Sequence, residues 1–264
     1  SEEKRKNLAN CRAGEYEGLS KKLIDPNWKP DFGPAAFTAK VAKSGATAVS
    51  ARGFLVAYNI NLNTTSTRRA NAIAFDLREA GRIATENGKP NGKQLVEENG
   101  EPVRIPGKLK AVKGIGWYIE EYGIAQISYN LTNIAITSVH VAFDETVKTA
   151  AERGLRVTGS ELIGLIPKQA MLDAADYFLT KQERSLGIDE AEKIKIAIKS
   201  LGLDDLKPFN PKERIIEYLL EDNSESRLVN MTLTDFANET ASESPAPGGG
   251  SISAYVGALG AALG

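Results

Sequence analysis

The stretch Phe54-Leu55-Val56-Ala57-Tyr58-Asn59-Ile60-Asn61-Leu62 alternates along its length, and this alternation decides how the surrounding chain is interpreted. Large apolar side chains occupy every second position from Phe54 to Leu62. Successive side chains of a strand point to opposite faces, so the pattern predicts a β-strand with one face against a core. Residues 66–84 then change period and place their apolar residues on one helical stripe, opposite charged ones. We therefore predict a strand followed by a helix.

The same two periods recur further along the chain. Strand-like runs cover residues 109–119 and 124–131 and are joined by a short turn that ends in Gly123. A helical pattern covers 138–153, and a last strand-like run covers 156–166. Strand, helix, strand, strand, helix, strand is the split βαββαβ order of ferredoxin-like folds, whose helices cover one face of the sheet. The predicted class is α/β of the α+β type: a ferredoxin-like subdomain followed by C-terminal helices.

Composition narrows the class of protein and of partner. The 264 residues are 42% hydrophobic and carry a formal net charge of −1, which gives no electrostatic reason to expect nucleic acid as a partner. One cysteine excludes an internal disulfide, and we expect a cytoplasmic protein. The apolar run 252–264 is too short for a membrane span, so we expect no membrane partner. Because this run also ends the chain, we expect the sequence to be an internal excerpt of a longer protein.

The single histidine, His140, allows two interpretations. It could act as a general base poised near neutral pH, or it could pack where strand gives way to helix. We favour packing, because no second strong base lies near it in the sequence. No His/Cys cluster exists, so a zinc-type site is excluded and we assign no metal.

Two glycine-containing segments could bind ligands. Residues 245–251, Pro-Ala-Pro-Gly-Gly-Gly-Ser, precede an apolar helix and could hold an anion at its N-terminus, serve as a linker, or form a tight helix entry. Residues 33–37, Gly-Pro-Ala-Ala-Phe, form a rigid small-residue loop that could lie against a flat ligand, with Arg52 as a candidate carboxylate clamp. From pattern alone, an ordinary proline-fixed connection is favoured for residues 33–37.

Longer motifs resemble a known family, glutamate formimidoyltransferase. The resemblance covers nearly everything from about residue 8 to residue 220, and its motifs are residues 11–19 (CRAGEYEGL), 30–34 (PDFGP), 58–62 (YNINL), 114–118 (GIGWY), 159–167 (GSELIGLIP) and 211–219 (PKERIIEYL). Residues 244–251 (SPAPGGGS) resemble the start of a formimidoyltetrahydrofolate cyclodeaminase domain, which follows the transferase on one chain in the bifunctional enzyme.

The resemblance implies a domain organisation. Residues 1–52 would be the tail of the transferase N-terminal subdomain and 53–222 the C-terminal subdomain. Residues 223–243 would be a linker with a short helix, and 244–264 the truncated start of the helical cyclodeaminase domain. Folate sits between the two transferase subdomains in this family.

The resemblance also implies a reaction and a ligand site. The family moves a formimidoyl group from N-formimidoyl-L-glutamate to tetrahydrofolate, a co-substrate, in histidine degradation and one-carbon metabolism. The family's catalytic histidine lies upstream of the matched residues, so we expect no catalytic residue in this chain and no activity of the excerpt alone. We also expect the parent protein to be a homo-oligomer. For the glutamate tail of folate, proximity in sequence suggests Arg52, Lys43 and Lys40. The residues matching the folate-contacting segment are Gly33, Pro34, Ala35, Ala36, Phe37, Thr38 and Gly45.

Two other functions remain open at this stage. A noncatalytic folate-binding or oligomerisation module is the main alternative to a transferase. An unrelated ferredoxin-like binding domain would require the motif matches to be accidental. The family's catalytic histidine, if found upstream in the parent sequence, would favour a transferase over both other functions.

Overall fold

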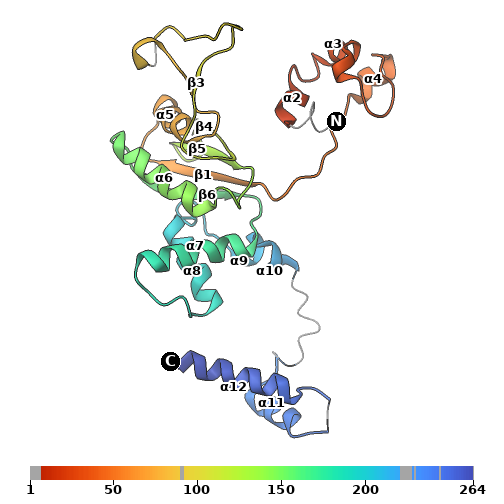
Figure 1. Cartoon of the computed structure of the whole chain (residues 1–264). Helices are drawn as coiled ribbons and strands as arrows, with labels where there is room; N and C mark the ends of the chain where they lie inside the picture. The colour runs from red at the N-terminus through yellow and green to blue at the C-terminus, as the bar shows by residue number, and fades with distance from the viewer. Residues whose placement is uncertain (1–6, 90–91, 221–227, 229, 244, 264) are drawn as a thin grey trace. The chain divides into compact units, whose positions relative to one another are not determined.

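The computed structural model describes residues 7–89, 92–220, 228, 230–243 and 245–263, and the chain divides into two compact units, Ser1–Arg52 and Gly53–Gly264 (Figure 1). In the first unit, short helices are joined by loops. Its elements are α2 (Leu8–Arg12), α3 (Leu19–Ile24), the 3-10 turn η1 (Pro26–Trp28) and α4 (Ala39–Ser44).

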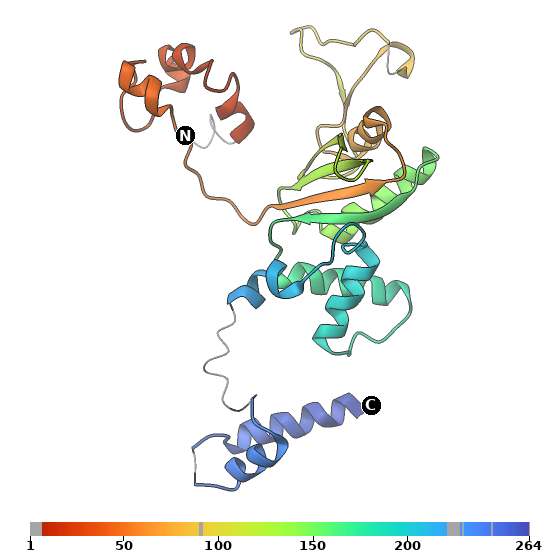
Figure 2. The same ribbon diagram turned by 180° about the vertical axis from the view of Figure 1, so that it is seen from behind.

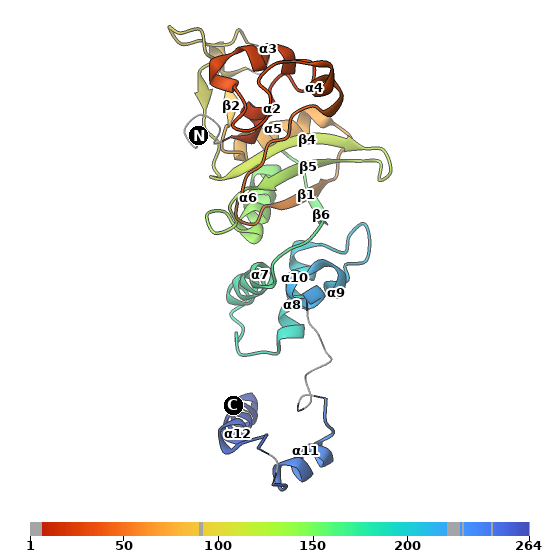
Figure 3. The ribbon, with the colours of Figure 1, turned by 90° about the vertical axis from the view of Figure 1, so that its right-hand side faces the viewer.

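The second unit is built on a four-stranded sheet. Its neighbouring strands are all antiparallel and run in the order β4-β5-β1-β6, which Figure 3 shows. The strands are β1 (Val56–Leu62), β4 (Val112–Ile119), β5 (Ile124–Leu131) and β6 (Val157–Ile163). This order places the first and third strands of the split pattern at the centre, as a ferredoxin-like fold requires. The predicted α+β class is confirmed.

Two helices cover one face of the sheet (Figure 1 and Figure 2). Helix α5 (Thr67–Leu77) packs on β4 and β5, and α6 (Val139–Glu152) packs on β1 and β6. The alternation seen in the sequence places Tyr58 and Ile60 of β1 in this core, where both are fully buried. The alternation of side chains therefore gave the core-facing side of β1 correctly from Val56 to Leu62, but Phe54, expected on the same face, precedes the strand and is 62% exposed.

The predicted helix 66–84 is wrong at its C-terminal end. Helix α5 stops at Leu77, and Ala80, expected on the buried stripe, is exposed. The chain turns at Gly81, where φ is +59° and an added Cβ would lie 1.8 Å from the carbonyl oxygen of Ile105. Only glycine fits this approach, which starts an excursion, the arm (residues 82–89 and 92–105), drawn in yellow in Figure 2. The arm contains β2 (Arg82–Ile83), η2 (Glu86–Gly88) and β3 (Arg104–Ile105).

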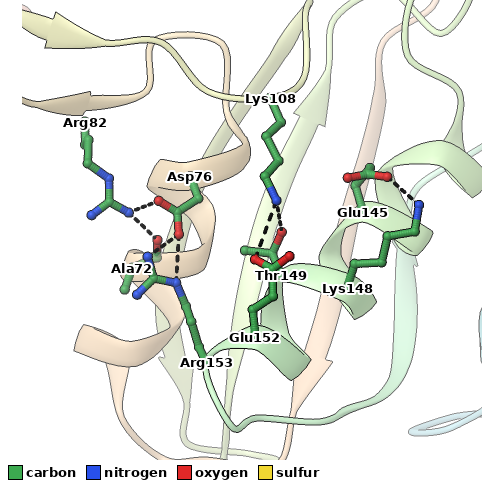
Figure 4. A network of polar contacts seen from close by, with 9 residues as sticks. All are labelled: Ala72, Asp76, Arg82, Lys108, Glu145, Lys148, Thr149, Glu152 and Arg153. Carbon is green, nitrogen blue, oxygen red and sulfur yellow. Dashed lines mark hydrogen bonds and ion pairs between the residues drawn. The ribbon is translucent and has the colours of Figure 1, made fainter.

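Ion pairs hold the base of the arm on the helix layer (Figure 4). Asp76 of α5 pairs with Arg82 of the arm and with Arg153, the residue after α6. Lys108, just beyond the arm, donates to Thr149 Oγ1 at 3.2 Å and lies 3.6 Å from Glu152 Oε2. Arm and helices thus share one charge network.

The C-terminal part of the second unit is helical. Asp189 caps α8 (Glu190–Leu201) and Asn210 caps α9 (Pro211–Arg214), each by accepting a hydrogen bond from a backbone nitrogen of the first turn, and α9 ends before Ile215, its C-cap residue. Helix α7 packs against both α6 and α8. The helices are α7 (Lys168–Lys181), α8 (Glu190–Leu201), α9 (Pro211–Arg214), α10 (Ile216–Leu220), α11 (Leu233–Thr240) and α12 (Gly249–Leu263).

Of the predicted linker with a short helix, residues 223–243, positions 223–227 and 229 lie outside the described residues, and the described part contains α11. The boundary predicted at 222/223 also lies outside the described residues. In the part of the chain that the structure describes, no helix is both long and apolar enough to span a membrane.

Candidate functional site

The opposite face of the sheet carries a row of polar side chains from β1, β5 and β6. Asn59 and Asn61 of β1 alternate with the core residues, so they point away from α5 and α6. The strand register places Gln126 of β5 opposite Asn61 and Glu161 of β6 opposite Asn59. We call Asn59, Asn61, Gln126 and Glu161 the polar row.

The amides of the polar row hold one another in place. Gln126 Nε2 donates to Asn61 Oδ1 at 2.8 Å, and Asn59 Nδ2 donates to Gln126 Oε1 at 3.2 Å. The three amide residues are 0–4% exposed. Buried amides without hydrogen bonds would cost free energy, so this mutual pairing fixes their orientation. The row is thus a rigid polar floor in the middle of a strand layer.

Glu161 is the charged member of the row. Its carboxylate accepts hydrogen bonds from Asn59 Nδ2 at 3.4 Å, Gln126 Nε2 at 3.2 Å and the hydroxyl of Tyr122 at 3.3 Å. All three donors are neutral, and the side chain is half-buried. Among the described residues, no cationic nitrogen lies within 4.0 Å of this carboxylate to form an ion pair.

A second carboxylate closes one end of the row. Asp205 Oδ2 accepts from Asn61 Nδ2 at 3.0 Å and from Thr158 Oγ1 at 3.3 Å. The loop after α8 reaches β6 because Gly159 has no side chain: an added Cβ would lie 2.4 Å from Cβ of Asp205. Gly159 therefore sets the position of Asp205.

Apolar side chains border the polar row. Trp117 and Ile115 of β4 lie opposite Gln126 and Ser128, so they share its face, and Ile163 of β6 lies on the same face. They are 45%, 52% and 47% exposed. Of the polar row only Glu161 is partly exposed, so Glu161 and these apolar edges are the parts of this face that a ligand with an apolar body and a hydrogen-bonding group could contact.

A small pocket lies at the β6 edge of the sheet, beside the polar row. Its volume is about 50 Å³, and Glu161, Lys207 and Arg214 supply its charged lining. A larger pocket of about 340 Å³ lies at the base of the arm, where Asp76, Arg82, Lys108 and Glu152 already pair with one another or with neighbouring groups. The arm-base pocket is therefore part of the structural ion-pair network.

The segment expected to contact folate lies in the first unit. Gly33 has φ of +84° with no atom within 4 Å of an added Cβ, so the backbone conformation is what favours glycine there. Thr38 caps α4 by accepting from the backbone nitrogen of Val41 at 3.3 Å, and Gly45, with φ of +67°, ends the same helix. Phe37 is 44% exposed.

The remaining residues of that segment are also accessible. Gly33, Pro34 and Ala36 are exposed, whereas Ala35 and Gly45 are half-buried. The three cations proposed for the folate tail, Lys40, Lys43 and Arg52, are exposed as well. Residues 33–37 are thus a surface loop that leads into α4, which Thr38 and Gly45 flank.

His140 is held as a packing residue between α6 and α7. Its Nε2 lies 2.9 Å from Ser138 Oγ, and its ring stacks on Tyr177 with 4.6 Å between centroids. Burial lowers the pKa of His140 below its ordinary value, while Asp173 and Asp144 offset part of this effect. Among the described residues, no group of three or more His, Cys, Asp or Glu side chains could hold a metal ion.

Sequence reasoning missed the polar row as a site. The available signal was the pair of asparagines at alternate positions of a strand centre, because Asn is depleted in strands. The partners Gln126, Glu161 and Asp205 could not be found this way, because they are 35 to 144 residues away from the residues they bond.

Fold and site together define an α+β protein with a ferredoxin-like subdomain and a polar sheet face suited to a small ligand. Family models match the chain in three places: "Formiminotransferase domain, N-terminal subdomain" over residues 1–52, "Formiminotransferase domain" over 57–221, and "Formiminotransferase-cyclodeaminase" over 232–264. The chain belongs to the formiminotransferase family.

Curated relatives share much of the sequence. The formimidoyltransferase-cyclodeaminase of Gallus gallus is 47% identical over 264 residues, which is 100% of this chain and 44% of the relative, and that of Dictyostelium discoideum is 44% identical over 262 residues (98% and 44%). The glutamate formimidoyltransferase of Streptococcus pyogenes serotype M1 is 36% identical over 180 residues, covering 68% of this chain and 50% of the relative. The chain thus spans about 44% of the length of the bifunctional relatives.

Proposed function

We propose that the full-length protein transfers the formimidoyl group of N-formimidoyl-L-glutamate to tetrahydrofolate, in histidine degradation and one-carbon metabolism. The observation that carries this proposal is the formiminotransferase family model, which covers residues 57–221 and so includes the whole polar row. Relatives named for this transfer, with and without a cyclodeaminase, support the same activity. We further propose that residues 244–264 open a cyclodeaminase domain, since a third family model covers this end of the chain.

We assign folate to the loop Gly33–Thr38 and Gly45. The exposed ring of Phe37 offers a flat apolar surface for the pterin, and the nearby cations Lys40, Lys43 and Arg52 suit the carboxylates of the glutamate tail. We place the general base outside residues 1–264, because the one histidine, His140, is engaged with Ser138 and Tyr177. A homo-oligomeric state remains a prediction.

The test uses the full-length protein and measures formimidoyl transfer while the tetrahydrofolate concentration is varied. Phe37→Ala should raise the KM for tetrahydrofolate roughly three- to tenfold, because the ring would no longer stack on the pterin. The matched control is Phe32→Ala, which removes a 93% exposed ring just before the proposed segment and should leave KM unchanged. Folate binding without transfer would instead identify a noncatalytic folate-binding module.

A further inference from the structure

Glu161 has no cationic partner among the described residues, unlike Asp144 and Asp76, two other shielded carboxylates of the second unit. Asp144, 9% exposed, has Lys181 Nζ at 2.6 Å, and Asp76 pairs with two arginines. Glu161 receives only neutral donors, at 3.2–3.4 Å, near the long limit for a hydrogen bond. A half-buried carboxylate is stabilised most by a cation, and this one has capacity left for it.

Arg214, a cationic side chain, lines the same pocket as Glu161. Arg214 is exposed, its guanidinium donates only to the carbonyl of Gly164 at 3.4 Å, and it pairs with no carboxylate among the described residues. Lys207, the other basic residue of that pocket, is already 2.9 Å from Glu121. The pocket edge therefore offers one unpaired anion and one unpaired cation.

These charges complement the donor substrate of the proposed function. A formimidoyl group attached to an amine is an amidine, a base that is protonated and planar at neutral pH, and its two N–H groups match the two oxygens of a carboxylate. The glutamate moiety carries carboxylates, which suit a guanidinium. Resting on that function, we propose that Glu161 binds the cationic formimidoyl group of N-formimidoyl-L-glutamate and that Arg214 binds one of its carboxylates.

The charge of the formimidoyl group gives a sharp test. N-formyl-L-glutamate replaces the protonated imino nitrogen with a neutral oxygen and keeps both carboxylates. In the full-length enzyme we expect this analogue to inhibit with a Ki at least about tenfold above the substrate KM, since a hydrogen bond between charged groups is lost. Comparable affinity of the unaltered enzyme for both compounds would overturn the proposal without any variant.

Two variants test which residue binds each end of the substrate. Glu161→Gln should raise the KM for N-formimidoyl-L-glutamate roughly tenfold to hundredfold, and should leave the Ki of the formyl analogue and the KM for tetrahydrofolate unchanged. Arg214→Gln should weaken both glutamate derivatives equally, because they share their carboxylates. If Arg214→Gln changes neither constant, the carboxylate assignment is wrong.

A matched control shows whether an effect of Glu161→Gln comes from the position of Glu161 or from the loss of any one negative charge. Glu120→Gln makes the same substitution at an exposed residue of the β4–β5 turn and should leave all constants unchanged. Thermal unfolding of each variant shows whether it is folded. A folded Glu161→Gln enzyme that still distinguishes the two compounds as the unaltered enzyme does would refute the role of Glu161. Absence of any transfer by the unaltered full-length protein would refute the proposed function itself.

Discussion

Gly116 of β4 allows α5 to approach the strand closely, because it has no side chain. A Cβ at this position would lie 2.3 Å from the backbone nitrogen of Asn71 in α5. The Asn71 side chain donates to the carbonyl of Gly116 at 3.1 Å and accepts from its N–H at 2.9 Å. Because β4 is an edge strand, these backbone groups would otherwise lack a partner strand. Gly116 and Asn71 thus close the edge and seat the helix together.

Gly116→Ala should destabilise the protein by about 1–3 kcal/mol, because the methyl group forces α5 away from β4. The midpoint of urea unfolding measures the loss. Gly53→Ala is the matched control: it has no atom within 4 Å of its added Cβ and should change the midpoint little. Equal midpoints for the two variants would show that α5 does not depend on this close approach.

At the scale of elements, the interface between α6 and α7 contains the chain's only histidine. His140 of α6 stacks on Tyr177 of α7, whose hydroxyl donates to Asp144 Oδ2 at 2.5 Å, and Lys181 Nζ reaches the same oxygen at 2.6 Å. Burial alone would raise the pKa of Asp144, but the hydrogen bonds from Lys181 and Tyr177 together lower it. The two helices are therefore joined by groups that titrate in different pH ranges.

This interface predicts a loss of stability on mild acidification. The pKa of His140 is depressed in the folded state, mainly by burial, from an ordinary value of 6.5, so the unfolded chain takes up the proton first. The free energy of unfolding should fall as the pH is lowered through about 6.5, measured as urea midpoints between about pH 7.5 and about pH 5.5. The contribution of Asp144 is lost only at lower pH, below its ordinary 3.8.

His140→Gln provides the control for the pH effect. Glutamine does not titrate, so the variant should show a flatter dependence over the same range, whatever its absolute stability. An unchanged slope would assign the pH dependence to groups other than His140.

The sequence predicted the helices and strands well, but the residues at which they begin and end less well. The strand 124–131 was predicted to the residue, because Gly123, with φ of +64°, marks its turn. Helix α5 was predicted seven residues too long at its C-terminal end, 84 against 77, because the arm begins where Gly81 meets Ile105. Contacts between residues distant in sequence decide such ends, and no local pattern contains them.

At the scale of the whole molecule, the candidate sites also differ in whether local sequence or contacts between distant residues define them. The loop Gly33–Gly45 follows from a family resemblance alone, because its local pattern is also that of an ordinary proline-fixed connection. The polar row depends on the register of three strands, which pairs Asn59 with Glu161 across 102 residues. Alternation could place Asn59 on the second face, but it could not show which carboxylate it would meet.

The distribution of the core predicts which part of the chain folds alone. Every member of the main hydrophobic core lies between Val56 and Ile215, whereas the described part of the first unit buries only two apolar side chains, Leu23 and Val41. A segment of 52 residues with so little buried apolar surface cannot offset its conformational entropy. Residues 53–220 expressed alone should therefore unfold cooperatively in urea, with a midpoint close to that of the 264-residue chain, and residues 1–52 alone should show no cooperative transition. A gradual, noncooperative loss of circular dichroism from residues 53–220 would mean that the sheet needs the first unit in order to fold.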